Sequence, residues 1–188
     1  MKKNFLILIF SLFFLLTFFF ITQISKNFTI FKEVGKVYNQ NNCEIKKEFF
    51  SVNGFSMQPM IKDKEEIEVF LNYYNCSKNK PKDGDIVIFE NPYTLERIIK
   101  KLYIIPGDEV KIDKETNTIK VNGKKLVNSQ NQAYIFKEPE LKWFEIYTEN
   151  GKVIENTYFI FGDNIYGSID SRSFGPITLE GLIGKKID

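Results

Sequence analysis

The stretch RIIKKLYIIPGDEV, residues 97–110, joins a long apolar run to a turn signal. Isoleucine and tyrosine favour strands, because branched and aromatic side chains pack well on a pleated sheet. The Pro-Gly-Asp sequence at 106–108 ends the run with residues that are typical of tight turns. We therefore predict a strand over 97–105 and, after the turn, a second strand over 109–112.

Similar short runs occur on both sides of this stretch. Each is rich in branched and aromatic residues and is bounded by Gly, Asn or Asp. Together, the predicted strands are 66–71, 85–90, 97–105, 109–112, 118–121 and 157–161. No long segment beyond the N-terminal region shows a helical period. The pattern predicts a mainly β fold, with the strands forming a barrel or a folded ribbon.

The composition excludes several kinds of chemistry. The 188 residues include 26 basic and 24 acidic ones, and this near balance gives no sign of a nucleic-acid partner. The chain contains no histidine, so it cannot build a Ser-His-Asp or Cys-His site, and zinc loses its commonest nitrogen ligand. Cys43 and Cys76 are too few for a thiolate zinc site, which leaves either a disulfide or two free thiols.

The N-terminal segment is strongly apolar. No charged residue lies between Asn4 and Ser25, and a helix rising about 1.5 Å per residue would make this run roughly 33 Å long. The alternative is a cleaved signal peptide, but the run exceeds the usual apolar region and no small-x-small site follows it. We predict a transmembrane signal-anchor over 1–25, in contact with the lipid bilayer, and a polar juxtamembrane tether over 26–48. Lysines flank the run on both sides, so the positive-inside rule favours a cytoplasmic N-terminus only weakly.

Ser56 and Lys100 are candidates for a reactive pair. Without histidine, a serine nucleophile needs another base, and a lysine can serve when burial in apolar surroundings lowers its pKa. Lys100 lies within an apolar run and, because side chains alternate along a strand, it faces away from Lys101. Taken singly, each candidate also has an ordinary explanation. Ser56 would be a turn residue, and Lys100 would be a solvated lysine on an edge strand.

Three blocks of sequence favour the reactive pair over these ordinary explanations, because they occur together and in one order. They are VNGFSMQPMI (52–61), GDIVIF (84–89) leading into RIIKKLYIIPGDEV (97–110), and FGDNIYGSIDSRSFG (161–175). In this combination the chain resembles the type I signal peptidases, which are membrane-anchored Ser/Lys endopeptidases that remove signal peptides from secreted proteins. The resemblance is to the short members with a single anchor. It implies a β-rich catalytic domain over 49–188 with a small variable insertion over 114–156.

The resemblance implies a role for each motif residue. Ser56 would be the nucleophile, with its backbone N–H as an oxyanion donor, and Lys100 would be the general base. Ser168 would orient the lysine amine through a hydrogen bond. Asp170 and Arg172 would form an ion pair that holds the catalytic loop.

The expected substrate-binding residues flank the nucleophile and the base. They are Gly54, Phe55, Met57, Ile98 and Ile99, and the substrate would lie extended beside them as an added strand. Some relatives carry an oxyanion-donating serine at the position of Gly54, so a backbone-only or water-assisted oxyanion hole is implied here. The implied substrates are signal peptides of preproteins, cleaved after small residues. No metal and no cofactor would take part.

Several positions depart from the family pattern. Met60 replaces the usual threonine, Lys64-Glu65 replaces a Gly-Asp pair, and Ile165-Tyr166-Gly167 replaces an Arg-Asp-Asn type sequence. None of these changes removes a catalytic group, and together they indicate a divergent member. In the insertion, Trp143, Phe144 and Tyr147 belong either to the core or to a membrane-contacting surface.

The resemblance also implies a location. The protein would be a single-pass protein of the bacterial cytoplasmic membrane, with its catalytic domain on the extracytoplasmic face. Two alternatives to a general signal peptidase stay open. One is a dedicated maturation peptidase for a pilin or a conjugation protein, and the other is a catalytically inactive, membrane-tethered β domain that binds peptides.

Overall fold

The computed structural model describes residues 44–76, 78–91 and 94–187. The predicted anchor, most of the predicted tether and Cys43 lie outside these residues. Within the described ranges, no helix has the length and apolar character that crossing a membrane requires. The first strand begins at Lys46, within the last three residues of the range predicted for the tether.

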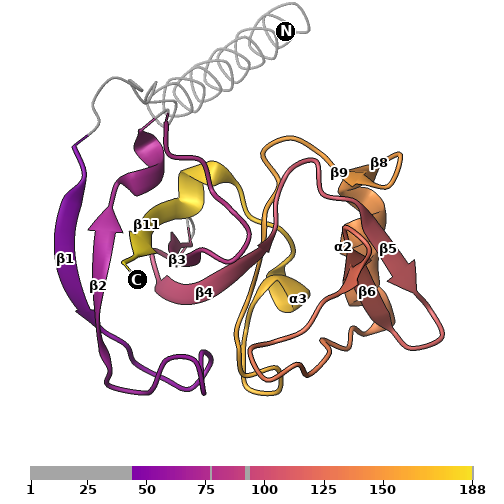
Figure 1. The fold of residues 1–188 in the computed structure, drawn as a ribbon, viewed down its shortest axis with the longest axis horizontal. Coiled ribbons are helices and arrows are strands. Elements are labelled where there is room, and N and C mark those ends of the chain that lie inside the picture. The colour runs from indigo at the N-terminus through magenta and orange to yellow at the C-terminus, as the bar shows by residue number, and fades with distance from the viewer. Residues whose placement is uncertain (1–43, 77, 92–93, 188) are drawn as a thin grey trace, which may run out of the picture. The chain divides into compact units, whose positions relative to one another are not determined.

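One antiparallel sheet carries most of the strands, in the order β1-β2-β11-β3-β4-β10. Its members are β1 (Lys46–Ser51), β2 (Glu66–Leu71), β3 (Ile86–Glu90), β4 (Arg97–Ile104), β10 (Phe159–Phe161) and β11 (Leu182–Lys186). Although β11 is the last strand of the chain, it lies between β2 and β3. The C-terminal strand therefore links β2 to β3, the strand that precedes β4 (Figure 1).

The remaining elements form a second group that follows β4. They are β5 (Val110–Asp113), β6 (Thr118–Val121), β7 (Lys124–Lys125), α2 (Glu138–Ile146), β8 (Thr148–Glu149) and β9 (Lys152–Val153). The first three strands form one small sheet, and β8 pairs with β9. Figure 1 shows this group on one side of the short helix α3 (Ser171–Phe174) and β1 and β2 on the other. The predicted insertion over 114–156 falls within this group.

The prediction of a mainly β fold is confirmed, and each predicted strand is present to within two residues at either end. Helix α2 was not predicted. Its nine residues are too few to establish a clear helical period, and the buried positions are Leu141 and Phe144. It begins with a proline in its first turn, and the Glu140 carboxylate accepts a hydrogen bond from the Lys137 backbone N–H at 2.8 Å.

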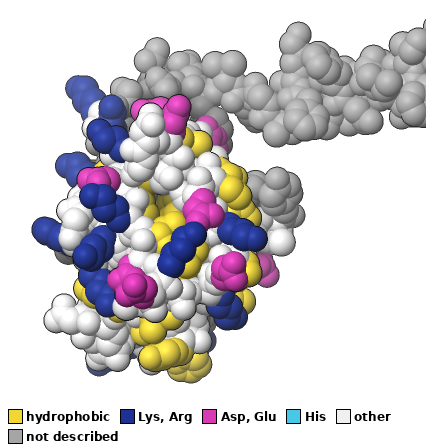
Figure 2. All heavy atoms as spheres, turned by 90° about the vertical axis from the view of Figure 1, so that its right-hand side faces the viewer, with side chains coloured by type: hydrophobic (Ala, Val, Ile, Leu, Met, Phe, Trp, Pro, Cys, Tyr) yellow, Lys and Arg dark blue, Asp and Glu magenta, His cyan; other side chains and the backbone are white. Residues whose placement is uncertain are grey.

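The aromatic cluster of the insertion belongs to the core. Phe144 has 2% of its surface exposed, and Trp143 and Tyr147 pack against the same buried group, which also includes Tyr134 and Phe161. The core interpretation of the aromatic cluster is therefore confirmed. Figure 2 shows the outer face of this region, where lysine and arginine side chains are interspersed with acidic ones around an apolar strip.

Candidate active site

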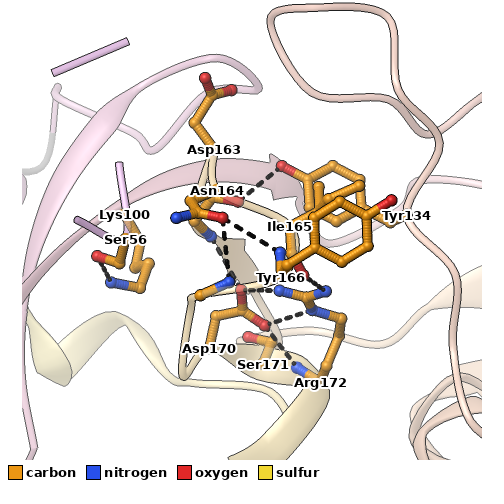
Figure 3. Close-up of polar contacts among 12 residues, drawn as sticks. Ser56, Lys100, Tyr134, Asp163, Asn164, Ile165, Tyr166, Asp170, Ser171 and Arg172 are labelled. Atoms are coloured by element: carbon orange, nitrogen blue, oxygen red, sulfur yellow. Dashed lines mark hydrogen bonds and ion pairs between the residues drawn. The ribbon is translucent and has the colours of Figure 1, made fainter. Parts of the chain in front are cut away.

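Ser56 and Lys100 meet in the folded chain. Lys100 Nζ donates a hydrogen bond to Ser56 Oγ at 2.8 Å (Figure 3). It donates a second one to the Ile99 carbonyl at 2.9 Å. Ser56 lies in the turn that follows β1, whereas Lys100 lies in the middle of β4. Two segments 44 positions apart thus bring an alcohol and an amine into contact.

Lys100 is buried, with 2% of its surface exposed. Alternation along β4 places it on the same face as Leu102 and Ile104, both of which are fully buried. Lys101 is partly exposed, and its ammonium lies 4.7 Å from the centre of the Tyr103 ring. The prediction that the two lysines face opposite sides of the strand is consistent with these surroundings.

Burial lowers the pKa of Lys100 from its ordinary 10.5 to about 8, and the negative charge of Asp170 opposes this shift. The cause is the loss of hydration, which penalises the ammonium form more than the neutral amine. At a pH near 8, a substantial fraction of the enzyme therefore carries a neutral amine beside the serine hydroxyl.

The ion pair between Asp170 and Arg172 is present. Arg172 Nη2 and Nε donate to the two carboxylate oxygens of Asp170 at 2.8 and 2.9 Å, and Asp170 is fully buried. Asp170 also accepts from the Gly162 backbone N–H at 3.0 Å, and Arg172 Nη1 donates to the Ile165 carbonyl at 2.6 Å. The pair thus holds both ends of the loop that runs from Gly162 to Asp170.

Ser168 departs from the expected geometry. Its Oγ is buried and makes no hydrogen bond within the described ranges, whereas Lys100 Nζ donates to Ser56 and Ile99. The expected Ser168–Lys100 hydrogen bond is therefore absent. A Cβ added to Gly162 would lie 2.1 Å from Ser168 Oγ and 2.5 Å from the Ser56 carbonyl oxygen, so Ser168 packs close to the nucleophile segment. Its role in orienting the lysine stays a prediction.

The expected substrate-binding residues fall into two groups. Gly54, Ile98 and Ile99 are partly exposed, and Phe55 is 61% exposed. Met57 is 1% exposed and packs in the core, and its contact with substrate stays a prediction. Met57 packs next to residues such as Ile61 and Val69.

Several functional contacts were missed by sequence reasoning. Asn164 donates to the carbonyl oxygens of Ser56 and Phe55, at 3.0 Å from its backbone nitrogen and at 3.2 Å from Nδ2. The Tyr134 hydroxyl donates to the Gly162 carbonyl at 3.0 Å. Asn164 lies within the Gly-Asp-Asn sequence of the third motif, and this position could have marked it as a candidate site residue. Nothing in the sequence connects Tyr134 to that motif.

Asp163 is a second missed residue of this block. It is fully buried and accepts hydrogen bonds from the backbone nitrogen and the Oγ of Ser129, at 2.9 and 2.5 Å. Asn128 Nδ2 adds a hydrogen bond to the Asp163 carbonyl at 3.0 Å. Asp163 therefore ties the catalytic loop to the insertion.

The described residues contain no cluster of three or more acidic or cysteine side chains that could hold a metal ion. The polar groups at the site are instead an alcohol, an amine, an ion pair and backbone amides. An alcohol in hydrogen-bond contact with a buried amine is the pair of groups that a serine hydrolase without histidine requires.

A serine beside a buried lysine on an antiparallel sheet defines a class of serine hydrolase. The comparison with protein families makes the class specific. The sequence model of the family described as "Signal peptidase, peptidase S26" matches residues 43–187, and the chain belongs to this family. It is accordingly a serine endopeptidase.

Individual relatives agree with this assignment. Signal peptidase I of Bacillus licheniformis is 34% identical over 142 residues, which cover 73% of this chain and 69% of that protein. Signal peptidase I of Leptolyngbya laminosa is 27% identical over 142 residues, covering 70% of this chain and 63% of that protein. Signal peptidase IB of Staphylococcus aureus N315 is 28% identical over 145 residues, covering 72% and 73%. A solved structure, signal peptidase I from Enterococcus faecalis V583, is 28% identical with a TM-score of 0.40, covering 56% of this chain and 96% of that one.

Proposed function

We propose that this protein removes signal peptides from exported preproteins, with Ser56 as the nucleophile and Lys100 as the general base. The observation that carries the proposal is the 2.8 Å contact between Lys100 Nζ and Ser56 Oγ in a chain without histidine. The family supplies the substrate class, because its printed description is that of signal peptidases.

The reaction uses each group twice. The neutral amine of Lys100 takes the proton of Ser56 as Oγ attacks the scissile carbonyl, and the resulting ammonium protonates the departing amine. An acyl-enzyme on Ser56 remains. Water then attacks the ester while Lys100 again accepts a proton, and the serine leaves with that proton when the acyl group is released. Burial supports this role because it keeps the amine available near pH 8.

The oxyanion hole is proposed to rest on the backbone N–H of Ser56. No described residue accepts a hydrogen bond from this amide. The Gly54 amide is already engaged, since it donates to Asp63 Oδ1 at 2.8 Å, and Gly54 has no side chain that could add a second donor. One donor of this kind is worth roughly 3 kcal/mol of transition-state stabilisation.

The substrate is proposed to lie extended along the exposed edge formed by Gly54, Phe55, Ile98 and Ile99. Backbone hydrogen bonds would then add it to the sheet as a strand. Ser168 is proposed to hydrogen-bond the lysine amine once that amine is neutral, because its buried hydroxyl has no other partner among the described residues.

The dyad is tested by preprotein cleavage with the full chain in detergent. Ser56→Ala is expected to abolish cleavage. Lys100→Arg is expected to do the same, because arginine keeps the charge but does not lose its proton. Lys101→Ala is the matched control and should retain most of the activity, since Lys101 Nζ lies over the Tyr103 ring. Near-normal turnover by Ser56→Ala would overturn the dyad, whereas failure of the wild-type chain to cleave any preprotein would favour the peptide-binding alternative.

The substrate range is tested with several unrelated preproteins. A general signal peptidase should cleave most of them at comparable rates. Cleavage of a single pilin-type or conjugation substrate would instead identify a dedicated maturation peptidase.

We further propose that residues 1–25 anchor the protein in the bacterial cytoplasmic membrane with the catalytic domain on the extracytoplasmic face. The support is the uncharged run from Asn4 to Ser25. Protease added to intact spheroplasts should digest the domain and leave a small protected fragment. Digestion that requires lysis would reverse the orientation.

A further inference from the structure

We propose that Asn164 is a positioning residue that aims the backbone N–H of Ser56 at the oxyanion. The inference rests on the proposed function, in which that amide is the oxyanion donor. Asn164 does not touch the reacting atoms in this arrangement. It acts through the two peptide groups that flank the nucleophile.

The contacts of Asn164 fall on both sides of Ser56. Its backbone N–H donates to the Ser56 carbonyl at 3.0 Å, which belongs to the peptide group after the nucleophile. Its side-chain Nδ2 donates to the Phe55 carbonyl at 3.2 Å, which belongs to the peptide group before it. One residue, 109 positions away from Phe55 along the chain, thus holds both peptide planes.

Because the peptide group is planar, the contact between Asn164 and the Phe55 carbonyl also determines which way the Ser56 N–H points. In a trans peptide, the C=O and the N–H of the same group point in opposite directions. The Phe55–Ser56 peptide is not among the cis peptides of the described chain. Because the Phe55 carbonyl points at Asn164, the Ser56 N–H points away from it. No described residue accepts that N–H, so it stays available to a substrate oxygen.

The orientation of the Asn164 amide is itself fixed. Its Oδ1 accepts from the backbone N–H groups of Tyr166 and Gly167, at 3.3 and 3.0 Å. Only an oxygen can accept these two hydrogen bonds, so the nitrogen must be the atom that faces Phe55. Gly167 allows the close approach, since a Cβ there would lie 2.7 Å from Nδ2.

A purely structural role for Asn164 makes a different prediction. Asparagine often nucleates a turn through its own side chain, and here it would only shape the loop from residue 164 to 167. Its loss would then lower stability without changing turnover of the folded enzyme. A positioning role requires that kcat falls while the enzyme remains folded and binds substrate.

The test is Asn164→Asp in the full chain in detergent, assayed for kcat and KM on a preprotein below the unfolding temperature of each variant. Aspartate keeps the acceptor for Tyr166 and Gly167 but replaces the donor to Phe55 with an oxygen that repels the carbonyl. We expect kcat to fall about 10- to 100-fold, with KM within about threefold of wild type. The midpoint of the pH–rate profile is compared in Asn164→Ala, which adds no charge near Lys100, and it should stay in place because the Lys100–Ser56 contact is unchanged.

Asn122→Asp is the matched control. Asn122 makes the same kind of paired contact far from Ser56 in the sequence, accepting from the Glu109 amide at 2.9 Å and donating to Asp108 at 2.7 Å. Its variant should lose stability but keep kcat. If Asn164→Asp does not fold, Asn164→Ala replaces it and should show the same fall in kcat at unchanged KM.

The outcomes separate this inference from the proposed function. Wild-type kcat in the folded Asn164 variant, together with an inactive Ser56→Ala, would overturn the positioning role and leave the dyad intact. A rise in KM alone would also overturn it, because it would place Asn164 in substrate binding. Activity retained by Ser56→Ala would instead remove the proposed function itself.

Discussion

Lys100 is almost fully buried in the folded protein. Its burial lowers the free energy of unfolding by an amount that depends on pH. Its pKa is about 8 in the folded chain and an ordinary 10.5 when hydrated. Below about 8 both states hold the proton, and the folded state carries the full penalty of a desolvated ammonium. Between these two values the unfolded state binds more protons, so stability rises with pH.

We predict that Lys100→Met is more stable than wild type at pH 6, because methionine fills the site without a charge. This advantage should shrink steadily as the pH rises from about 8 to 10.5. Urea unfolding at a series of pH values measures it. A difference in unfolding free energy that stays constant across this range would contradict the depressed pKa.

Gly162 is the residue at which the loop and the nucleophile segment come closest. A Cβ there would lie 2.1 Å from Ser168 Oγ and 2.5 Å from the Ser56 carbonyl oxygen. We predict that Gly162→Ala lowers stability by about 1–3 kcal/mol and removes most of the activity, because the displaced groups include the backbone of the nucleophile. Thermal unfolding and preprotein cleavage measure the two effects.

Gly181→Ala is the comparison for this variant. A Cβ at Gly181 would crowd the Phe89 ring, at 2.4 Å, rather than the nucleophile segment. It should lower stability while the folded fraction keeps its kcat. Equal activity losses in both variants would show that the effect of Gly162→Ala is general destabilisation.

At the scale of elements, the insertion supports the catalytic loop through Tyr134. Its hydroxyl donates to the Gly162 carbonyl at 3.0 Å and lies 3.2 Å from the Tyr103 hydroxyl, and its ring lies 5.4 Å from the Arg172 guanidinium. We predict that Tyr134→Phe costs about 1–3 kcal/mol of stability, because it leaves a buried carbonyl without its donor. Denaturant unfolding measures the loss.

Tyr103→Phe is the control for this prediction. It removes only the Tyr103 hydroxyl beside Tyr134 and leaves the donation to Gly162 in place, so it should cost less. A Tyr103→Phe loss as large as that of Tyr134→Phe would mean that the contact between the two tyrosines, and not the Gly162 contact, stabilises the loop.

The strands that could be predicted are those whose burial follows their sequence pattern. β2 and β4 combine branched residues with turn signals at their ends. β1 could not be predicted in this way, because nearly every residue of KKEFFS is exposed and the strand forms by pairing with β2. β11 contains Gly184, which packs where a Cβ would lie 2.9 Å from a Val69 methyl, so its fit depends on a neighbour rather than on its own pattern.

The candidate site also contains residues that could be predicted from the sequence and residues that could not. Ser56 and Lys100 could be proposed from the absence of histidine, an apolar run and the motifs, and the ion pair of Asp170 and Arg172 from the family resemblance. The roles of Asn164 and Tyr134 could not, because their partners Phe55 and Gly162 lie 109 and 28 positions away. The burial of Met57 could not be predicted either, because its position beside Ser56 in the sequence does not determine which way its side chain turns.

At the scale of the whole molecule, Cys76 links the domain to another part of the chain. It is 3% exposed and disulfide-bonded, while Cys43 lies outside the described residues. We predict a Cys43–Cys76 bridge whose reduction lowers stability by about 2–4 kcal/mol without abolishing cleavage, since neither sulfur belongs to the dyad. Thiol labelling without reductant should find no free sulfhydryl, and two readily labelled thiols would exclude the bridge.

The contacts between the insertion and the catalytic loop restrict how this enzyme can be recombined with its relatives. Ser129 and Tyr134 of the insertion reach Asp163 and Gly162, and the ring of Trp143 covers Gly175 just after α3. A chimera that receives a foreign segment over 114–156 without these partners would lose support for its catalytic loop. Substitutions at such positions should therefore be inherited in compensating pairs, one on each side of the contact.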